Sequence, residues 1–262
     1  QFFGFFQIST TLWVTGSFDN PAGFAACLCA GFPFVGFLLS DSNKYIRYVG
    51  GLIGFVIVIA VILSQSRAGI MSIAFICFIL LNMKFFHKRW VKYLSLLCFA
   101  LLLSGCYWMK KDSADGRLLI WRCSVSMVKD APWLGHGIGS FEARYMDYQA
   151  DYFRQYGLNR YSMLADNVKH PFNEYLGVLL NFGFVGLLMI LALITLLIYC
   201  YKKHPCAEKR IAFYSLISIG VFSFFSYTFT YPFTWIVTFL CIIILTKEYI
   251  AKVFTCPIIK NT

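Results

Sequence analysis

The chain has 262 residues, a net charge of +11 and a hydrophobic content of 59%, well above the roughly 45–50% of a soluble domain. Charged residues make up only 13% and fall in blocks between apolar runs of about 20 residues, the length that crosses a bilayer as a helix. This pattern excludes an ordinary soluble domain, and it assigns the positive charge to membrane topology and not to a nucleic-acid surface.

Seven apolar stretches predict an all-α, polytopic membrane protein, because lipid offers an unpaired backbone no hydrogen-bond partners. The chain begins at Gln1 and not at Met, so we interpret it as the C-terminal part of a longer protein. In chain order the predicted spans are Pro21–Ser40, Ile46–Leu63, Gly69–Phe86, Val91–Trp108, Phe172–Tyr201, Ile211–Thr230 and Pro232–Thr246.

The distribution of charge orients these spans. One side carries 13 basic and three acidic residues, net +10, and the other carries 10 basic and nine acidic residues, net +1. The positive-inside rule makes the first side cytoplasmic. We therefore divide the chain into membrane helices over 1–108, a long non-cytoplasmic loop over 109–170, membrane helices over 171–247 and a cytoplasmic tail over 248–262.

The loop Met109–His170 is too long for a simple helix connection and too aromatic to be disordered. Its pattern predicts two short amphipathic helices. The first begins at Asp115 or Gly116 and is stopped by Pro132, and the second runs from an N-cap at Ser140 to a stop near Gly157. A stripe of Tyr145, Tyr148 and Tyr152 on the second helix suits stacking on sugar rings and anchoring at the lipid headgroups equally well.

Arg67 follows a Ser64-Gln65-Ser66 turn between two predicted spans, on the outer side. Placing an ionisable group near the membrane core costs free energy. This favours a functional arginine over one that only snorkels, with its guanidinium group at the interface. Further along, Arg117 and Trp121 are four residues apart on the first loop helix and share a face. Arg122 points about 140° away from Arg117, so the two arginines cannot face one ligand. Spacing alone is also compatible with two solvated arginines.

His170 precedes Pro171, and we predict that it caps the fifth span. Continued helical spacing would then place His170, Asn173, Glu174, Gly177 and Asn181 on one polar face that lines a protein interior. The positive end of the helix dipole beside His170 favours the neutral imidazole, which can accept a proton. A capping histidine without chemistry is the alternative.

Other motifs indicate little chemistry. The ten cysteines include no C-x-x-C pair and form no cluster with histidine, so neither a zinc site nor a disulfide framework is expected. The run Gly135-His136-Gly137-Ile138-Gly139 follows no strand and is better interpreted as a tight turn than as a phosphate loop. No D-x-D motif is present, and we expect no metal and no cofactor.

Four stretches together resemble the O-antigen ligase superfamily, which includes O-antigen polymerases and protein O-oligosaccharyltransferases. In chain order they are Thr15-Gly16-Ser17-Phe18-Asp19-Asn20-Pro21; Leu63-Ser64-Gln65-Ser66-Arg67-Ala68-Gly69; Gly116-Arg117-Leu118-Leu119-Ile120-Trp121 with Pro132-Trp133-Leu134-Gly135-His136-Gly137; and His170-Pro171-Phe172-Asn173-Glu174-Tyr175-Leu176 with Gly183-Phe184-Val185-Gly186-Leu187. The order and spacing of the four stretches cover nearly the whole chain.

The resemblance implies an enzyme of the bacterial inner membrane whose catalytic loop, 109–170, faces the periplasm. It would transfer an undecaprenyl-diphosphate-linked glycan en bloc, with inversion, to an acceptor hydroxyl at the periplasmic face. The implied acceptor is a glycan, lipid A-core or a protein. The implied catalytic residues are Arg67, Arg117 and His170, and the residues implied or expected to contact substrate are Arg67, Arg117, Arg122, Trp121, Asn173 and Glu174. Many relatives have a second histidine where this chain has Phe172, and an acidic residue where it has Asn181. The alternative from another class is a lipid-linked glycan flippase, which should show ionisable groups at the midplane and broken helices.

Overall fold

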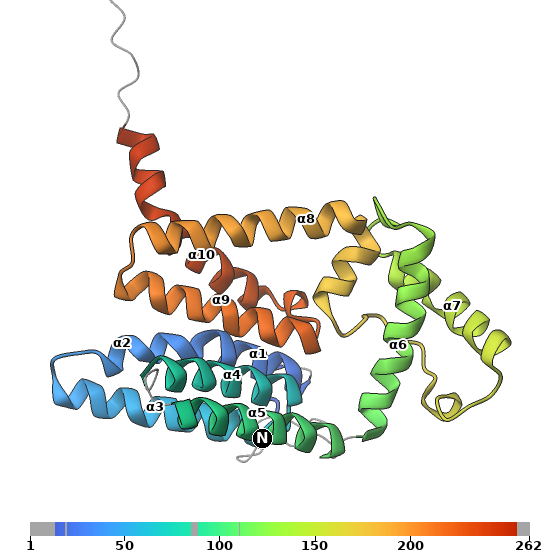
Figure 1. Ribbon diagram of the computed structural model, residues 1–262, viewed down its shortest axis with the longest axis horizontal. Helices are drawn as coiled ribbons and strands as arrows, with labels where there is room; N and C mark the ends of the chain where they lie inside the picture. Colours follow the sequence, from blue (N-terminus) through green and yellow to red (C-terminus); the bar gives the residue numbers. More distant parts are fainter. Residues whose placement is uncertain (1–13, 19, 85–88, 110, 256–262) are drawn as a thin grey trace, which may run out of the picture.

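A computed structural model describes residues 14–18, 20–84, 89–109 and 111–255 of the chain (Figure 1). Within these ranges the fold is all-helical and contains no strand, as predicted. The elements are α1 (Pro21–Gly31), η1 (Phe32–Phe34), α2 (Val35–Leu39), α3 (Lys44–Leu63), α4 (Arg67–Lys84), α5 (Arg89–Met109), α6 (Lys111–Asp130), α7 (Ser140–Tyr156), η2 (Ser162–Leu164), α8 (Glu174–Lys203), α9 (Ala207–Phe225), η3 (Thr228–Thr230) and α10 (Pro232–Thr255).

Four helical segments in the described residues are long and apolar enough to cross a membrane, namely Pro21–Leu39, Lys44–Leu63, Glu174–Lys203 and Pro232–Tyr249. The third and fourth predicted spans correspond to shorter apolar helices, Arg67–Met83 and Trp90–Gly105. The sixth corresponds to α9, whose first turn carries Glu208, Lys209 and Arg210. The protein is a multi-pass membrane protein, and the count of seven spans stays a prediction.

Helix α9 is the centre of the bundle and packs against α1, α4, α8 and α10. Its serines allow this close approach, because small side chains let helices meet and their hydroxyls bond across the interface. The Ser215 hydroxyl donates to the Ala30 carbonyl at 2.6 Å, and the Ser218 hydroxyl donates to the Cys29 carbonyl at 2.7 Å. Ser72 of α4 also bonds Ser218. These contacts join α1, α4 and α9 into one rigid unit.

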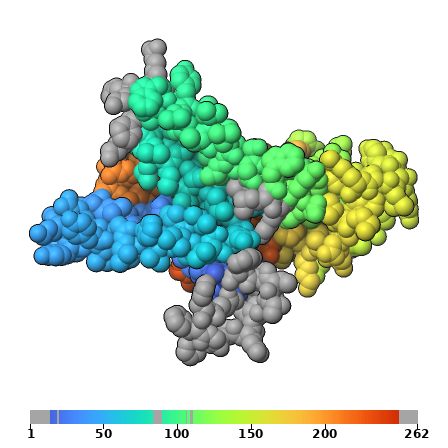
Figure 2. All heavy atoms as spheres, turned by 90° about the horizontal axis from the view of Figure 1, so that it is seen from below, coloured from blue at the N-terminus to red at the C-terminus, as the bar shows by residue number. Residues whose placement is uncertain are grey.

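The long loop folds as a lobe at one end of the bundle, where α6 runs across the bundle end and α7 lies on its far side (Figures 1 and 2). Both predicted helices are present. α6 begins at Lys111, four residues before the predicted start, and ends at Asp130; α7 begins at Ser140, with Gly139 and not Ser140 as its N-cap. The lobe has its own hydrophobic core, which includes Leu119, Met127, Phe141, Tyr145 and Tyr161. Tyr145 is 1% exposed, so both roles considered for the tyrosine stripe are wrong at that position.

Helix α8 differs from the predicted fifth span at its start. It begins at Glu174, and the Asn173 side chain caps it by accepting from the Leu176 amide at 3.0 Å. The prediction that His170 caps this helix is therefore wrong. The reason lies at Phe172, whose φ of 52° is left-handed and stops the helix from extending back to Pro171. His170 lies in the turn before the helix, so it shares no helical face with Asn181.

Helix α8 is also broken at Gly183, where φ is 62° and ψ is −159°. The backbone of residues 132–139, here called the tip loop, enters this break. The His136 amide donates to the Leu180 carbonyl at 2.7 Å and the Gly137 amide to the Asn181 carbonyl at 3.1 Å. In return the Phe184 amide donates to the Pro132 carbonyl at 2.8 Å. The glycine-rich run is thus a turn, as predicted, and it replaces the helical hydrogen bonds that the break removes.

Replacing Gly183 with alanine should disrupt this join. A Cβ atom there would lie 2.3 Å from the carbonyl carbon and oxygen of Trp133, and the backbone conformation is one that only glycine adopts easily. We expect a loss of about 2–5 kcal/mol in the free energy of unfolding, from strain plus overpacking. Thermal denaturation in detergent measures it. Gly51→Ala is the matched control, since nothing lies within 4 Å of its Cβ position and alanine favours the helix. Equal melting temperatures for the two variants would contradict the assigned contact.

Candidate functional site

The turn before α4 fixes Arg67 at the first position of that helix. Gln65 has a left-handed φ of 51°, and the serines on either side satisfy the backbone of the turn. The Ser64 hydroxyl donates to the Val61 carbonyl at 2.7 Å, and the Ser66 hydroxyl accepts from the Gly69 amide at 3.3 Å. Arg67 then donates from Nη2 to the Ser113 hydroxyl of α6 at 2.8 Å. Its charge adds to the positive end of the α4 dipole.

Arg117 and Trp121 extend from the same face of α6, as the four-residue spacing predicts. Arg117 donates from Nη1 to the Phe225 carbonyl at the end of α9, at 2.7 Å. Trp121 donates from Nε1 to the Pro171 carbonyl at 2.9 Å. One face of α6 therefore holds two distant segments together, the end of α9 and the turn that precedes α8.

Arg67 and Arg117 line one cavity of about 190 Å³, together with Tyr107, Trp121 and Phe225. The lining contains two guanidinium groups and no carboxylate among the described residues. Burial, and then the charge of Arg67, lower the pKa of Arg117 to about 10, so Arg117 stays protonated at neutral pH. Two like charges that face one small cavity create a strong positive potential, and an anion with several oxygens matches it.

His170 is joined to this cavity by two aromatic rings. Its imidazole stacks on Tyr227, with ring centroids 4.7 Å apart. Tyr227 meets Phe172 edge-on at 5.3 Å, and the Arg117 guanidinium lies 5.0 Å from the centroid of Phe172. The left-handed backbone of Phe172 thus places its ring between Arg117 and Tyr227. A bulky residue is rarely held at positive φ, and such strain is common at functional sites.

Burial lowers the pKa of His170 below its ordinary value of 6.5, and of its charged neighbours Glu142 raises the pKa while Lys169 lowers it. A lowered pKa keeps the imidazole neutral at pH 7, which is the form that accepts a proton. The sequence also predicts a neutral imidazole, but for a different reason. The pKa is lowered by burial of the ring, which stacks on Tyr227, and His170 does not lie at the end of a helix.

Asn173 and Glu174 make structural contacts. Asn173 is the N-cap of α8, and the Glu174 carboxylate accepts from the Phe229 amide at 2.7 Å. The second contact fixes the segment 226–231, which contains Tyr227. These contacts position the turn before α8 and the segment after α9, and the predicted role of both residues in substrate binding stays a prediction.

Arg122 faces away from the cavity, as predicted from the helical wheel. Its guanidinium lies 5.1 Å from the centroid of the buried Tyr161 ring and donates to the Tyr152 hydroxyl at 3.4 Å. The structure therefore brings together Arg67, Arg117 and Trp121 at the cavity, joins His170 to them through aromatic rings, and leaves Arg122 on the opposite face of α6.

Sequence reasoning missed Tyr227 and the Phe225 carbonyl. The predicted sixth span ran to Thr230, but α9 ends at Phe225. The sequence did contain a signal that this span was too long. The predicted sixth span ends at Thr230 and the seventh begins at Pro232, which leaves one residue between two antiparallel helices, whereas such connections usually have two to eight residues. The polar and aromatic run Ser226-Tyr227-Thr228 is that connection.

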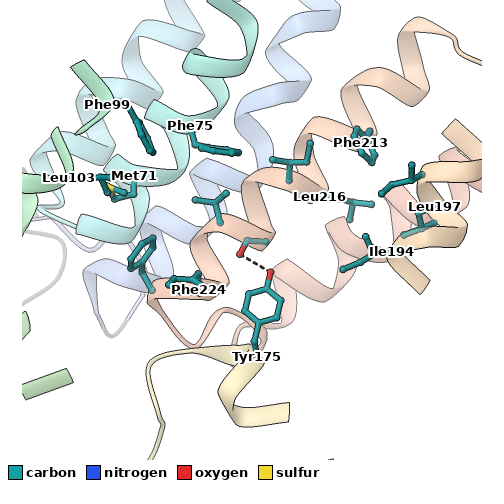
Figure 3. Close-up of a pocket in the computed structure, with 15 residues that line it drawn as sticks. Met71, Phe75, Phe99, Leu103, Tyr175, Ile194, Leu197, Phe213, Leu216 and Phe224 are labelled. Atoms are coloured by element: carbon teal, nitrogen blue, oxygen red, sulfur yellow. Dashed lines mark hydrogen bonds between the residues drawn. The ribbon is translucent and has the colours of Figure 1, made fainter. Parts of the chain in front are cut away.

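A second, larger cavity has a volume of about 670 Å³ (Figure 3). Its lining is apolar apart from Tyr175, whose hydroxyl donates to the Gly220 carbonyl at 2.9 Å. The two cavities share Met71, Leu103 and Phe225. Side chains from α4, α5, α8 and α9 form its walls, so it lies among the apolar helices of the bundle. In the described residues, no three His, Cys, Asp or Glu side chains gather as a metal site requires.

The fold and the site together define a multi-pass membrane protein with a cationic cavity at one end of its bundle. The family model described as O-antigen ligase matches residues 52–191, more than half of the chain, and the chain belongs to this family. Members of the family are membrane glycosyltransferases, either ligases or polymerases. The matched region contains Arg67, Arg117, Trp121 and His170. No curated protein matches the chain.

Proposed function

We propose that this protein transfers a glycan from an undecaprenyl-diphosphate carrier to an acceptor hydroxyl, at the periplasmic face of the bacterial inner membrane. The observation that carries the proposal is that two cavities lie next to each other, with Met71, Leu103 and Phe225 in the lining of both. One cavity is lined by two arginines and the other is apolar, and the pair matches a donor with a diphosphate head and a polyprenyl tail. The resemblance noted in the sequence points to the same donor.

Arg67 and Arg117 bind the diphosphate. Negative charge grows on the leaving diphosphate as its bond to the sugar breaks, and fixed guanidinium groups stabilise that charge in place of a metal ion. Arginine also matches phosphate oxygens with paired hydrogen bonds. The apolar cavity, at about 670 Å³, takes the first isoprene units of the tail, and the rest extends into lipid.

His170 is the general base. Its neutral imidazole accepts the proton of the acceptor hydroxyl as the acceptor oxygen bonds to the anomeric carbon and the bond from that carbon to the diphosphate oxygen breaks. Attack from the side opposite the leaving group inverts the anomeric centre. The products are the glycosylated acceptor and the polyprenyl diphosphate, and His170 then returns its proton to water.

The acceptor separates three versions of this function, namely a ligase acting on lipid A-core, a polymerase acting on a second lipid-linked glycan, and a protein glycosylating enzyme. Glycan-chain analysis of a deletion strain distinguishes them. Loss of attached glycan from lipid A-core with accumulated donor indicates a ligase, and loss of chain length alone indicates a polymerase. Loss of glycan from proteins alone indicates the third, and an unchanged glycan profile contradicts the proposed transfer.

A flippase is the second candidate, and the break in α8 favours it, since transporters often use broken helices. The break here holds the backbone of the tip loop and not a substrate path, because the carbonyls of Leu180 and Asn181 are bonded to that loop. A donor-translocation assay in vesicles, run beside the transfer assay, separates the two functions.

We expect the lobe to be accessible from outside the inner membrane, given the net charges of +10 and +1 on the two sides. Leu158, next to the end of α7, is 88% exposed and suits a cysteine label better than Cys123, which is 1% exposed. A membrane-impermeant thiol reagent should label Leu158→Cys in spheroplasts and leave the exposed Cys206 unlabelled until the membrane is opened. Labelling with the opposite preference would reverse the topology.

A further inference from the structure

The break in α8 marks the depth of the membrane boundary. From Phe184 to Lys203 the helix runs 20 residues, about 30 Å at 1.5 Å per residue, which equals the thickness of a hydrocarbon core. Lys202 and Lys203 mark one end of this stretch. Gly183 therefore lies at the opposite boundary, and the first part of α8 bends away from the long straight part at this point (Figure 1).

The backbone of the tip loop meets the physical requirement for lying at a membrane boundary. An irregular backbone is stable there only where its polar groups are hydrogen-bonded within the protein. Four backbone hydrogen bonds join the tip loop to α8 across the break, and the last of them runs from the Val185 amide to the Trp133 carbonyl at 3.2 Å. Gly135 permits the approach, since a Cβ there would lie 2.6 Å from the Asn181 carbonyl carbon.

The three largest apolar side chains of the tip loop are exposed. Trp133, Leu134 and Ile138 are 69%, 75% and 84% exposed. The Trp133 ring meets the Phe184 ring edge-on, with ring centroids 6.1 Å apart. The apolar surface of the tip loop therefore continues into the exposed apolar face of α8, which includes Leu188. The loop carries no acidic or basic side chain apart from His136, whose ring bonds the Met127 carbonyl and Arg144.

We propose that the tip loop is a membrane anchor whose side chains Trp133, Leu134 and Ile138 insert into the bilayer at the headgroup–acyl boundary. Tryptophan favours that layer, and the continuity with the lipid-facing side of α8 identifies lipid as the partner of this surface. The anchor also sets the depth of the arginine cavity. α6 carries Arg117 and Trp121 at the cavity and ends at Asp130, one residue before the tip loop, so a single helix connects the anchor to the site.

Spin-label accessibility tests the anchor without reference to transfer. In a folded variant without native cysteines, Leu134→Cys and Leu158→Cys are labelled with a nitroxide and reconstituted into phosphatidylethanolamine–phosphatidylglycerol vesicles. The two leucines are 75% and 88% exposed and belong to the same lobe, so they form a matched pair. We expect collisions with oxygen to dominate at position 134, as at Leu188→Cys on α8, and collisions with a water-soluble nickel complex to dominate at 158. Equal nickel accessibility at 134 and 158 would overturn the proposal.

A second measurement needs no cysteine removal. The fluorescence difference between the native protein and Trp133→Phe isolates the emission of Trp133. In vesicles with brominated acyl chains that difference should shrink severalfold, while aqueous iodide should leave it unchanged. Quenching of Trp133 by iodide and not by bromolipid excludes insertion, whatever the protein transfers.

Discussion

Replacing His170 with alanine is expected to lower glycan transfer at least a hundredfold, within the range of about 10²–10⁴ that a general base contributes. Binding of undecaprenyl diphosphate should stay near its native value, because His170 lies outside the lining of the arginine cavity. This separation of binding from chemistry is the signature of a group that acts on the acceptor. Transfer by purified protein in proteoliposomes, measured beside binding, gives both quantities.

The pH profile provides a control for this assignment. Because the pKa of His170 lies below 6.5, transfer should be constant near pH 7 and fall only as the pH drops through that lowered value. Tyr227→Ala removes the ring that buries the imidazole, so the acid limb should move up toward 6.5; Tyr227→Phe keeps the ring and should keep the limb. Normal transfer by a folded His170→Ala variant would leave the histidine without a chemical role.

The sequence was a good guide to the elements of the fold and a poor guide to their ends. Apolar runs and turn residues located the helices, including both loop helices, because these signals are local. The predicted start of α8 was wrong. Pro171 suggested the first position of a helix, but the left-handed Phe172 and the Asn173 cap make the helix begin three residues later, at Glu174. The break at Gly183 depends on contact with a loop about 50 residues earlier, and no local pattern predicts it.

The candidate site was predictable as a list of residues and not as a geometry. Helical spacing correctly grouped Arg117 with Trp121 and separated Arg122. Arg67 lies at the start of α4 and Arg117 in the first half of α6. Only the packing of the bundle brings these two residues to one cavity. Tyr227 was missed because the sixth span was predicted to run on to Thr230, whereas α9 ends at Phe225; its contact with His170 further depends on how Glu174 fixes the segment after α9.

Alanine at Arg67 or Arg117 is the second substitution with a large expected effect. Each removes counter-charge that the leaving diphosphate needs, which typically raises the barrier by about 3 kcal/mol and lowers the rate about a hundredfold. Unlike His170→Ala, both variants should also bind undecaprenyl diphosphate more weakly, because both guanidinium groups line the cavity. Lysine should restore little, since an ammonium group cannot make paired hydrogen bonds to phosphate.

Arg122→Ala is the matched control for this pair. It removes the same charge from the same helix, five residues from Arg117, but its guanidinium contacts Tyr152 and Tyr161 and not the cavity. Transfer by Arg122→Ala should therefore stay within a few-fold of native. Arg117 also bonds the Phe225 carbonyl, so the melting temperature of each variant is needed to separate lost chemistry from lost packing. If Arg122→Ala is inactive while Arg117→Ala is active, the diphosphate binds on the other face of α6 and the cavity between Arg67 and Arg117 is not the donor site.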